Sequence, residues 1–487
     1  METQSTPTLL ETFTKLLETI DGYVWGIPLI LLIILGGLFL TIRLGGMQFI
    51  RLPLAMKYML KNEKSGKGEV SSFAALCTAL SATIGTGNIV GVATAVISGG
   101  PGALFWMWLA ALLGMATKYS EGLLAIKYRT HDPKTNHVLG GPFYYIERGM
   151  GSKWIWLAKF FAFAGVLVGL FGIGTFSQVN SINTAVNTAY TTIFANSTVP
   201  TYTFLGAEYT LVTIISSIII ALLVGLVVIG GIQRIGKVSE KVIPFMVILY
   251  LAISILLIVT NITKVDDALV LIFKSAFGLD AAAGGMLGAM IVAMQKGVAR
   301  GIFSNEAGLG SAPIAAAAAQ TNEPVRQGLV SMTGTFLDTI IVCSMTGLAL
   351  VMTGAYDGAH GQGAQATMYA FNVGLPFFSK TLTDTIIAIC MILFGFTTIL
   401  GWNYYSERCL EYLTKGKMGP VLAYRWMYII AVFIGPYMTI SAVWVIADIF
   451  NGIMALPNMI ALFALSGVIV KETRDYFERK KRGEIIE

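Results

Sequence analysis

The stretch of the chain best suited to chemistry lies between Ser71 and Gly102, inside a long apolar run. Its centre, residues 81–88 (SATIGTGN), combines hydroxyl and amide side chains with two glycines. Each glycine weakens a helix by about 1 kcal/mol relative to alanine. Unpaired backbone groups in hydrocarbon are costly, so an unwound segment persists there only beside a cavity or a ligand. The pattern predicts a broken helix whose free amides hold an anionic group and whose free carbonyls hold a cation. Close helix packing through small residues is the alternative.

A second stretch of this kind is RGIFSNEAGLGSAP, from Arg300 to Pro313, which contains its own glycine pair at Gly308 and Gly310. The two glycine pairs are separated by five predicted spans, an odd number, so the two helices cross the membrane in opposite directions. Discontinuous helices at corresponding places in two inverted halves indicate a transport site near the midplane. Such a site suits a zwitterion together with a metal cation.

The composition requires a helical membrane protein to position these segments. Of the 487 residues, 55% are hydrophobic and 12% are charged, whereas soluble domains carry about 25% charged residues. The apolar runs are about 20 residues or longer, which fits membrane helices and excludes the shorter alternating segments of outer-membrane barrels. The net charge of +6 reflects basic residues in loops, and it does not favour nucleic acid as a partner.

Hydropathy predicts 11 spans, and the fourth, seventh and ninth are long enough to require tilt, breaks or extensions outside the membrane. Their limits are 23–43, 71–98, 102–127, 154–193, 208–231, 239–262, 283–319, 325–355, 381–413, 420–440 and 442–470. On one side the loops and tail hold 24 Lys and Arg residues, and the other side holds four. The positive-inside rule then places the N-terminus outside and the C-terminus in the cytoplasm.

We therefore expect an all-α, multi-pass protein of the cell membrane, in contact with lipid, with a 5+5 inverted repeat and one extra N-terminal helix. The predicted segments are an extracellular segment 1–22, an extra helix 23–43, a first repeat 71–262, a second repeat 283–470 and a cytoplasmic tail 471–487.

Four motifs carry a resemblance to a known family: GTGNIVG, GGPGALFWMW, RGIFSNEAGLGSAP and FGFTTILGWNYYSER. They closely resemble the alanine/glycine:cation symporters, also called sodium:alanine symporters, and the likeness extends over nearly the whole chain. The resemblance implies the leucine-transporter fold and import of small neutral amino acids, alanine and glycine, with Na⁺ as the coupling ion. It also implies a transporter that works as a monomer and is not an enzyme.

The resemblance assigns ligands at the first break. Backbone amides for the substrate carboxylate come from Gly85, Thr86 and Gly87, and Asn88 lies beside the substrate-adjacent sodium site. A second sodium site combines backbone carbonyls with two hydroxyls, from Ser81, Ile84, Thr397 and Thr398. Carbonyl and hydroxyl oxygens suit a hard cation. Alternatively, the two threonine hydroxyls bond to their own helix carbonyls.

Further substrate-binding positions are predicted around the two breaks. They are Thr78, Phe176, Gln178, Gln295, Phe303, Asn305 and Trp402. Isolated amides in membrane helices also serve as contacts between helices. Charged residues within spans need partners. Lys118 and Glu121 lie three apart and could pair on one helix face. We interpret these two, together with Lys296, Arg300 and Glu306 near the second break, as structural pairs or contacts of a cytoplasmic gate.

Three alternatives stay open. The sixth span has no lysine between Val242 and Thr260, which favours Na⁺, but Asp338 in the eighth span keeps H⁺ coupling as an alternative. A channel with re-entrant selectivity elements is a second possibility, since glycine-rich backbone at the midplane also suits a filter. A membrane-embedded enzyme is disfavoured because the sequence shows no metal-ligand spacing, Ser–His pairing or phosphate-binding loop.

Overall fold

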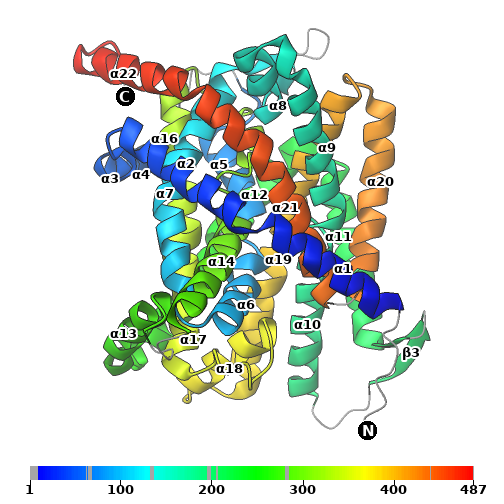
Figure 1. Ribbon diagram of the computed structural model, residues 1–487. Helices are drawn as coiled ribbons and strands as arrows, with labels where there is room; N and C mark the ends of the chain where they lie inside the picture. Colours follow the sequence, from blue (N-terminus) through cyan, green and yellow to red (C-terminus); the bar gives the residue numbers. More distant parts are fainter. Residues whose placement is uncertain are drawn as a thin grey trace.

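The computed structural model describes residues 9–61, 63, 68–131, 137–194, 199–204, 207–279, 285–438 and 440–485. These residues form a bundle of long helices (Figure 1). Two short antiparallel strand pairs lie outside the bundle, β1 (Thr130–His131) with β2 (Val138–Leu139) and β3 (Thr201–Phe204) with β4 (Ala207–Thr210). In the described part of the chain, ten helices are long and apolar enough to cross a membrane, and one bent pair makes up to an eleventh. The predicted all-α architecture of about 11 spans is confirmed.

The helices before the second half are α1 (Leu9–Val24), α2 (Ile27–Arg43), α3 (Met47–Ile50), α4 (Leu52–Leu60), α5 (Ser72–Thr83), η1 (Thr86–Asn88), α6 (Val90–Gly99), α7 (Ala103–Lys127), α8 (Pro142–Tyr145), η2 (Ile146–Met150), η3 (Ser152–Trp154), α9 (Ile155–Phe171), α10 (Phe176–Ile193), α11 (Leu211–Val228), α12 (Gly231–Thr260), η4 (Ile262–Lys264) and α13 (Val265–Ala276). The second half contains α14 (Met286–Asn305), α15 (Ala312–Ala316), α16 (Pro324–Thr335), the π-helix η5 (Phe336–Cys343), α17 (Ser344–Thr353), α18 (Ala364–Gly374), α19 (Lys380–Leu413), α20 (Met418–Ile434), η6 (Gly435–Tyr437), α21 (Ile440–Ala464) and α22 (Ser466–Lys481).

The predicted broken helices are both present. Helices α5 and α6 meet at an angle of 57° across the short turn η1. In the second half, α14 ends at Asn305, and the chain passes through positive φ at Glu306 (58°), Gly308 (92°) and Gly310 (81°) before α15. Glycine adopts these left-handed conformations at little cost, whereas Glu306 does so with strain. The glycine pairs predicted from sequence therefore mark true interruptions.

The long predicted spans have different explanations. The fourth is interrupted between Phe171 and Phe176, where α9 gives way to α10. The seventh is α14 and α15 with the second break between them, and its first predicted residues, 283 and 284, lie outside the described residues. The ninth is the continuous 34-residue helix α19, about 51 Å long, which exceeds a hydrocarbon core of about 30 Å.

The extra N-terminal helix extends further than the sequence predicts. Within the described residues the chain is helical from Leu9, and a single apolar span covers Lys15–Arg43 with a bend at Gly26. The Trp25 indole Nε1 donates to the Asp448 carbonyl at 2.8 Å, which fastens this span to α21. Figure 1 shows α1 and α2 crossing the bundle beside α21.

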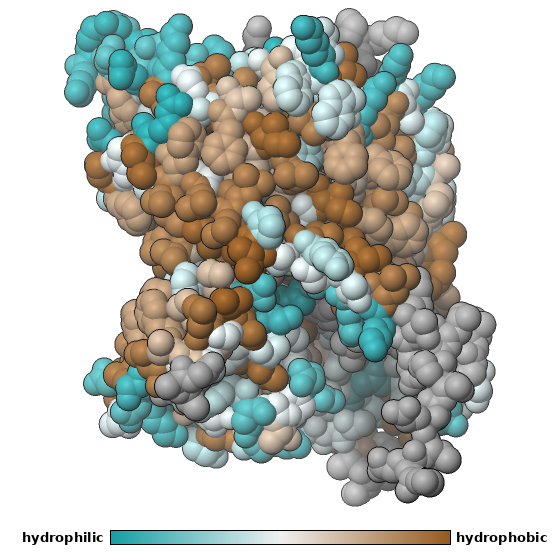
Figure 2. Space-filling view, viewed as in Figure 1, coloured by the Kyte–Doolittle hydropathy of each residue, from teal (hydrophilic) through white to brown (hydrophobic). Residues whose placement is uncertain are grey.

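The surface of the molecule matches a membrane protein. Figure 2 shows a broad hydrophobic band between two hydrophilic ends. Outward-facing aliphatic side chains, such as Leu226 (64% exposed) and Ile248 (67% exposed), would be costly in water and are suited to lipid. Helix α22 and the start of α1 lie at opposite ends of the bundle (Figure 1), as an odd number of spans requires. We call these the α22 end and the β3–β4 end.

Candidate functional site

The first break releases the backbone groups that the sequence predicts as ligands. The Gly85 amide donates to Asn88 Oδ1 at 2.8 Å, and the Thr86 amide donates to Gln178 Oε1 at 3.0 Å. In a regular helix these amides would bind the carbonyls of residues 81 and 82. The Asn88 amide binds the Gly85 carbonyl at 3.1 Å instead of that of Ile84. The carbonyls of residues 81, 82 and 84 are thus relieved of their helical partners.

Helix α19 packs directly on this unwound backbone. A Cβ atom at Gly85 would collide with Thr398 Oγ1, and one at Gly401 would lie 2.7 Å from Ser81 Oγ. The absence of both methyl groups lets the two segments approach closely. The structure therefore packs α19 on both ends of this stretch, with Gly401 beside Ser81 and Thr398 beside Gly85, and the second sodium site stays a prediction.

The hydroxyls of the threonine pair also bond to their own helix. Thr398 Oγ1 donates to the Phe394 carbonyl at 3.1 Å, and Thr397 Oγ1 approaches the same carbonyl at 3.0 Å. Thr397 Oγ1 additionally lies 3.6 Å from Met246 Sδ, on the side of α12. A hydroxyl that donates its proton keeps its lone pairs. The helix bond of Thr398 is consequently compatible with a cation on the side facing Gly85.

On the substrate side of the break, Gln178 of α10 contacts a predicted anchoring amide. Gln178 Oε1 accepts from both the Thr86 amide (3.0 Å) and the Thr86 hydroxyl (2.8 Å). An oxygen of a substrate carboxylate would accept the same donors. The Phe303 ring covers the other side, because a Cβ at Gly87 would lie 3.1 Å from it. Gln178 and Phe303 therefore border the backbone predicted to bind substrate.

Asn88 belongs to a polar cluster whose centre is Asp338, in the π-helix η5. Asn88 Nδ2 lies 2.7 Å from Asp338 Oδ1. The other carboxylate oxygen accepts from Ser304 at 2.8 Å and from Thr339 at 2.7 Å. Asp338 is fully buried, and it links the first break to α14 just before the second. The sequence draws attention to Asp338 as a buried carboxylate but gives no sign of these partners.

Around the second break, Asn305 and Trp402 occupy different positions. Asn305 Oδ1 accepts from the Ala307 amide at 2.9 Å and its Nδ2 donates to Thr339, so the side chain caps the end of α14. Trp402 is buried beneath the α9–α10 interruption, where a Cβ at Gly174 would lie 2.8 Å from Trp402 Cβ. Neither side chain is seen to border the first break.

Three further predicted substrate residues have contacts with other parts of the structure. Thr78 Oγ1 bonds to the Ala74 carbonyl and faces Gly236 of α12. Phe176 packs against Gly435 of η6. Gln295 is half-buried in α14, ten residues before Asn305 and so about 15 Å along the helix. The structure does not bring these three together with Gly85, and their contact with substrate stays a prediction.

A cavity opens near the β3–β4 end, along the helix that carries Gln178. Its volume is about 760 Å³. Its wall on α10 consists of amide and hydroxyl side chains spaced along one helix face, Asn180, Asn183, Thr184, Asn187, Thr188 and Thr191. A polar stripe on a membrane helix implies contact with water or with another helix. The recurrence of Asn and Thr at steps of three and four was the available sequence signal.

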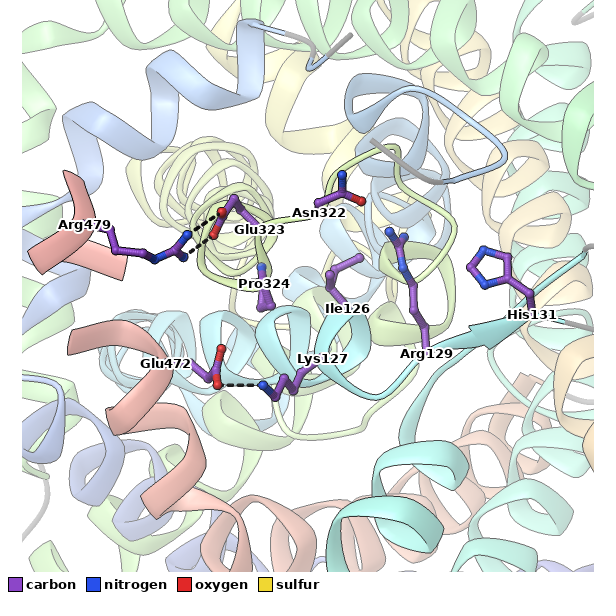
Figure 3. Close-up of a pocket in the computed structure, with 9 residues that line it drawn as sticks. All are labelled: Ile126, Lys127, Arg129, His131, Asn322, Glu323, Pro324, Glu472 and Arg479. Carbon is purple, nitrogen blue, oxygen red and sulfur yellow. Dashed lines mark hydrogen bonds and ion pairs between the residues drawn. The ribbon is translucent and has the colours of Figure 1, made fainter. Parts of the chain in front are cut away.

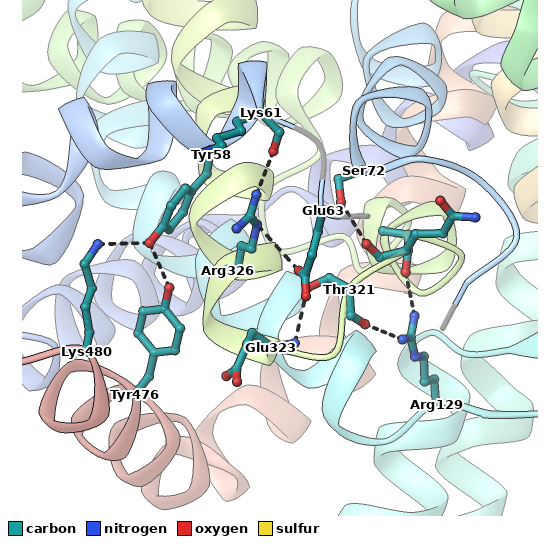
Figure 4. Close-up of polar contacts among 12 residues, drawn as sticks. Tyr58, Lys61, Glu63, Ser72, Arg129, Thr321, Glu323, Arg326, Tyr476 and Lys480 are labelled. Carbon is teal, nitrogen blue, oxygen red and sulfur yellow. Dashed lines mark hydrogen bonds and ion pairs between the residues drawn. The ribbon is translucent and has the colours of Figure 1, made fainter. Parts of the chain in front are cut away.

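The α22 end is closed over the first broken helix. Residues 68–70, just before α5, pair with the end of the second broken helix: the Glu69 amide binds the Ala318 carbonyl at 2.9 Å, and Val70 bridges Ala319. Arg129 donates to the carbonyls of Ala319 (2.7 Å) and Thr321 (2.5 Å) in the same turn (Figure 4). This end holds both broken helices in contact.

Ion pairs fasten α22 across the same face. A pocket lined by charged residues, about 450 Å³ in volume, lies between α7, the turn at residues 322–324 and α22, and Figure 3 shows its lining residues. Within it, Arg479 binds both oxygens of Glu323 (2.7 and 2.9 Å), and Lys127 binds Glu472 at 2.8 Å. The hydrogen bonds that Arg479 donates to Glu323 raise the pKa of Arg479.

The charged residues that the sequence predicts as structural pairs or gate contacts bind other groups in the structure. Lys118 Nζ donates to the Asn305 carbonyl at 2.8 Å, and Glu121 Oε1 accepts from the Gly308 amide at 3.1 Å, so both hold the second break. Arg300 forms an ion pair with Asp448 of α21 at 2.7 Å.

Two interrupted helices in opposite halves, with unwound backbone gathered at the centre of the bundle, define a multi-pass transporter of the leucine-transporter-like fold. A solved structure, MhsT in complex with L-phenylalanine, has the same fold, with a TM-score of 0.54, 11% sequence identity and coverage of 84% of this chain and 99% of that one.

The chain belongs to the sodium:alanine symporter family, whose sequence model matches residues 10–487. An uncharacterised transporter of Haemophilus influenzae is 55% identical over 471 residues, which cover 96% of this chain and 97% of that one. The sodium/alanine symporter AgcS of Methanococcus maripaludis is 43% identical over 479 residues, which cover 96% and 98% of the two chains. The protein is thus a transporter and not an enzyme.

Proposed function

We propose that this protein imports alanine, glycine and similarly small neutral amino acids with Na⁺, by alternating access around the two broken helices. The observation that carries the proposal is the released backbone at residues 81–88, which faces Thr398 on one side and Gln178 on the other. The family to which the chain belongs and the name of the AgcS relative support alanine and sodium.

The proposed substrate site uses the amides of residues 85–87 for the carboxylate. Phe303 leaves little room beside Gly87, which suits a short side chain. Two cation sites are proposed. One combines the carbonyls of Ser81 and Ile84 with the hydroxyls of Thr397 and Thr398. The other lies beside Asn88, where Asp338 supplies negative charge.

The proposed transport direction follows from the charge of the loops. The α22 end carries the basic excess and is assigned to the cytoplasm, so the cavity along α10 faces outside. An inward Na⁺ gradient and the membrane potential then drive import, and the potential contributes about 2.3 kcal/mol per charge per 100 mV. All proposed ligands come from one chain, so a monomer suffices.

Proton-coupled symport is the second candidate, because Asp338 is a buried carboxylate beside Asn88. The two candidates differ in one measurement. Under Na⁺ coupling, alanine uptake into proteoliposomes requires an inward Na⁺ gradient at every pH. Uptake that is equal without Na⁺ and follows the pH gradient would favour protons.

The same assay tests the sodium ligand on α19. Thr398→Ala removes the hydroxyl that faces Gly85, and we expect it to raise the Na⁺ concentration for half-maximal uptake. Thr385→Ala is the matched control, since Thr385 lies on the same helix and its hydroxyl donates to the carbonyl of Thr381, one turn earlier, at 2.7 Å. Equal sodium dependence in both variants would contradict this site.

A further inference from the structure

Two carboxylates and one ammonium group surround the second break. Glu121 and Glu306 are both 0% exposed, and Lys118 is 3% exposed. With all three ionised, the group carries one uncompensated negative charge. A buried charge without a counter-charge is expensive, and a carboxyl in this position takes up a proton instead.

Both carboxylates are bound to the loop that interrupts the helix. Glu121 Oε1 accepts from the Gly308 amide (3.1 Å) and from Asn458 Nδ2 (2.6 Å), while Asn458 Nδ2 also donates to the Gly308 carbonyl. Glu306, at the start of the loop, accepts from Ser311 Oγ at 2.6 Å, at the loop's other end. The charge of the pair is therefore tied to the conformation of residues 306–311.

One of the two carboxylates also has an oxygen that no described donor reaches. Among the described residues, Glu121 Oε2 and the Tyr405 hydroxyl are buried without a hydrogen-bond partner, while the buried Trp402 indole lies beside Glu306. Tyr405 lies close enough to interact electrostatically with both carboxylates. The unpaired oxygen of Glu121 can carry a proton.

The surroundings suit a proton better than a metal ion. The polar groups that meet the two carboxylates are donors: the Gly308 amide, Asn458 Nδ2, Ser311 Oγ and the nearby Lys118 ammonium. Donor hydrogens repel a cation, whereas Na⁺ needs several oxygen ligands. A proton requires only one carboxylate oxygen.

We propose that Glu121 and Glu306 together bind one proton, at a site separate from the coupling cation beside Asn88. The proton is bound to one carboxyl oxygen of the pair. When the loop at residues 306–311 rearranges, the O–H bond breaks, the proton passes to water and the carboxylate that held it becomes ionised. Transport in saturating Na⁺ then falls as the pH rises. The transport readout, but not proton binding, depends on the proposed function.

The charged and titratable groups that face this pair come from four elements. They are Lys118 on α7, Tyr145 on α8, Asp338 on η5 and Tyr405 on α19. Lys118 also interacts with Asp338, so Asp338→Asn belongs among the test variants.

Infrared spectroscopy of the purified protein tests proton binding directly. We expect the carbonyl band of a protonated carboxyl at pH 7 in the wild type, and its loss or shift in Glu121→Gln or Glu306→Gln. Glu478→Gln, at an exposed position of α22, is the matched control and keeps the band. Absence of the band in the wild type, or its loss only in Asp338→Asn, would overturn the proposal.

The second measurement is alanine uptake in saturating Na⁺ as a function of external and internal pH. Glutamine resembles a protonated carboxyl, so Glu306→Gln should transport with the pH dependence lost, whereas Glu478→Gln should keep the wild-type profile. A wild-type profile in Glu306→Gln contradicts the coupling of this proton to transport. If Na⁺ proves irrelevant while the infrared band is present, the proposed function fails and the proton site stands.

Discussion

Asn88 and Asp338 are 250 residues apart in the chain, yet Asn88 Nδ2 lies 2.7 Å from Asp338 Oδ1. The contact joins the unwound turn of the first broken helix to the π-helix η5. Because Asp338 also accepts from Ser304 of α14, one carboxylate connects both broken helices. A cation bound beside Asn88 would therefore interact, through Asp338, with both broken helices.

Replacing Asp338 with asparagine should weaken the effect of Na⁺ on alanine binding. The change keeps the shape but removes the charge, and hydrogen bonds to charged groups are worth about 1.5–3 kcal/mol. We expect a roughly tenfold or greater rise in the Na⁺ concentration that gives half-maximal alanine binding, measured in a Na⁺ titration. Asp357→Asn, at an exposed turn, is the control. An unchanged sodium requirement in Asp338→Asn would remove Asp338 from the cation site.

Gly85→Ala should abolish transport, because the added methyl group would collide with Thr398 Oγ1. The collision separates α19 from the unwound backbone and disrupts the proposed cation and substrate sites together. Gly288→Ala is the matched control, since a Cβ at Gly288 meets nothing within 4 Å. Uptake by both variants is compared after gel filtration has shown that each is folded. Normal uptake by Gly85→Ala would contradict the close packing.

Gly68→Ala should loosen the closure at the α22 end. A Cβ at Gly68 would lie 2.5 Å from the Ala319 backbone, where the two broken helices meet. We expect faster labelling of Cys77, which is buried in α5, by a membrane-permeant thiol reagent in a variant that retains only this cysteine. Gly467→Ala, where the added methyl meets nothing within 4 Å, serves as control. Equal labelling rates in the two would show that this contact does not close the protein.

Glu69 should stabilise the protein in a pH-dependent way. Burial opposes its ionisation, but the hydrogen bonds from His137 and from the Val138 amide outweigh burial and lower the pKa of Glu69 below 4.5. A lowered pKa in the folded state means that the stabilisation is present above pH 4.5 and is lost as the pH falls through the lowered value. Glu69→Gln should thus melt at a lower temperature than the wild type at pH 7, and the difference should shrink in acid. A difference in melting temperature that does not change with pH would contradict an ionised Glu69 at this contact.

The sequence was sufficient for the breaks and the spans because their causes are local. Glycine pairs within apolar runs weaken the helix where they stand, and hydropathy sets the span length, so the interruptions near Gly85 and Gly308 were predictable. The family resemblance placed Thr398 with Ser81 and Ile84 at a sodium site, which stays a prediction, and in the structure Thr398 packs against Gly85.

Long-range polar contacts were not predictable from the sequence. Lys118 and Glu121 are spaced to face each other on one helix, yet each binds the backbone of the second break, because unwound backbone has unpaired groups to satisfy. The partners of Asp338 depend on how three distant helices pack. Gln295 has a suitable residue type, but the rise of α14 carries it away from the break.

The most direct test of the account is calorimetric binding of alanine to the purified wild-type protein, with Na⁺ and with choline in its place. If the released backbone at residues 81–88 holds an amino acid together with its ion, alanine should bind measurably with Na⁺ and much more weakly with choline, and Asn88→Ala should lose the difference. Alanine binding of equal affinity in the two salts would contradict the account.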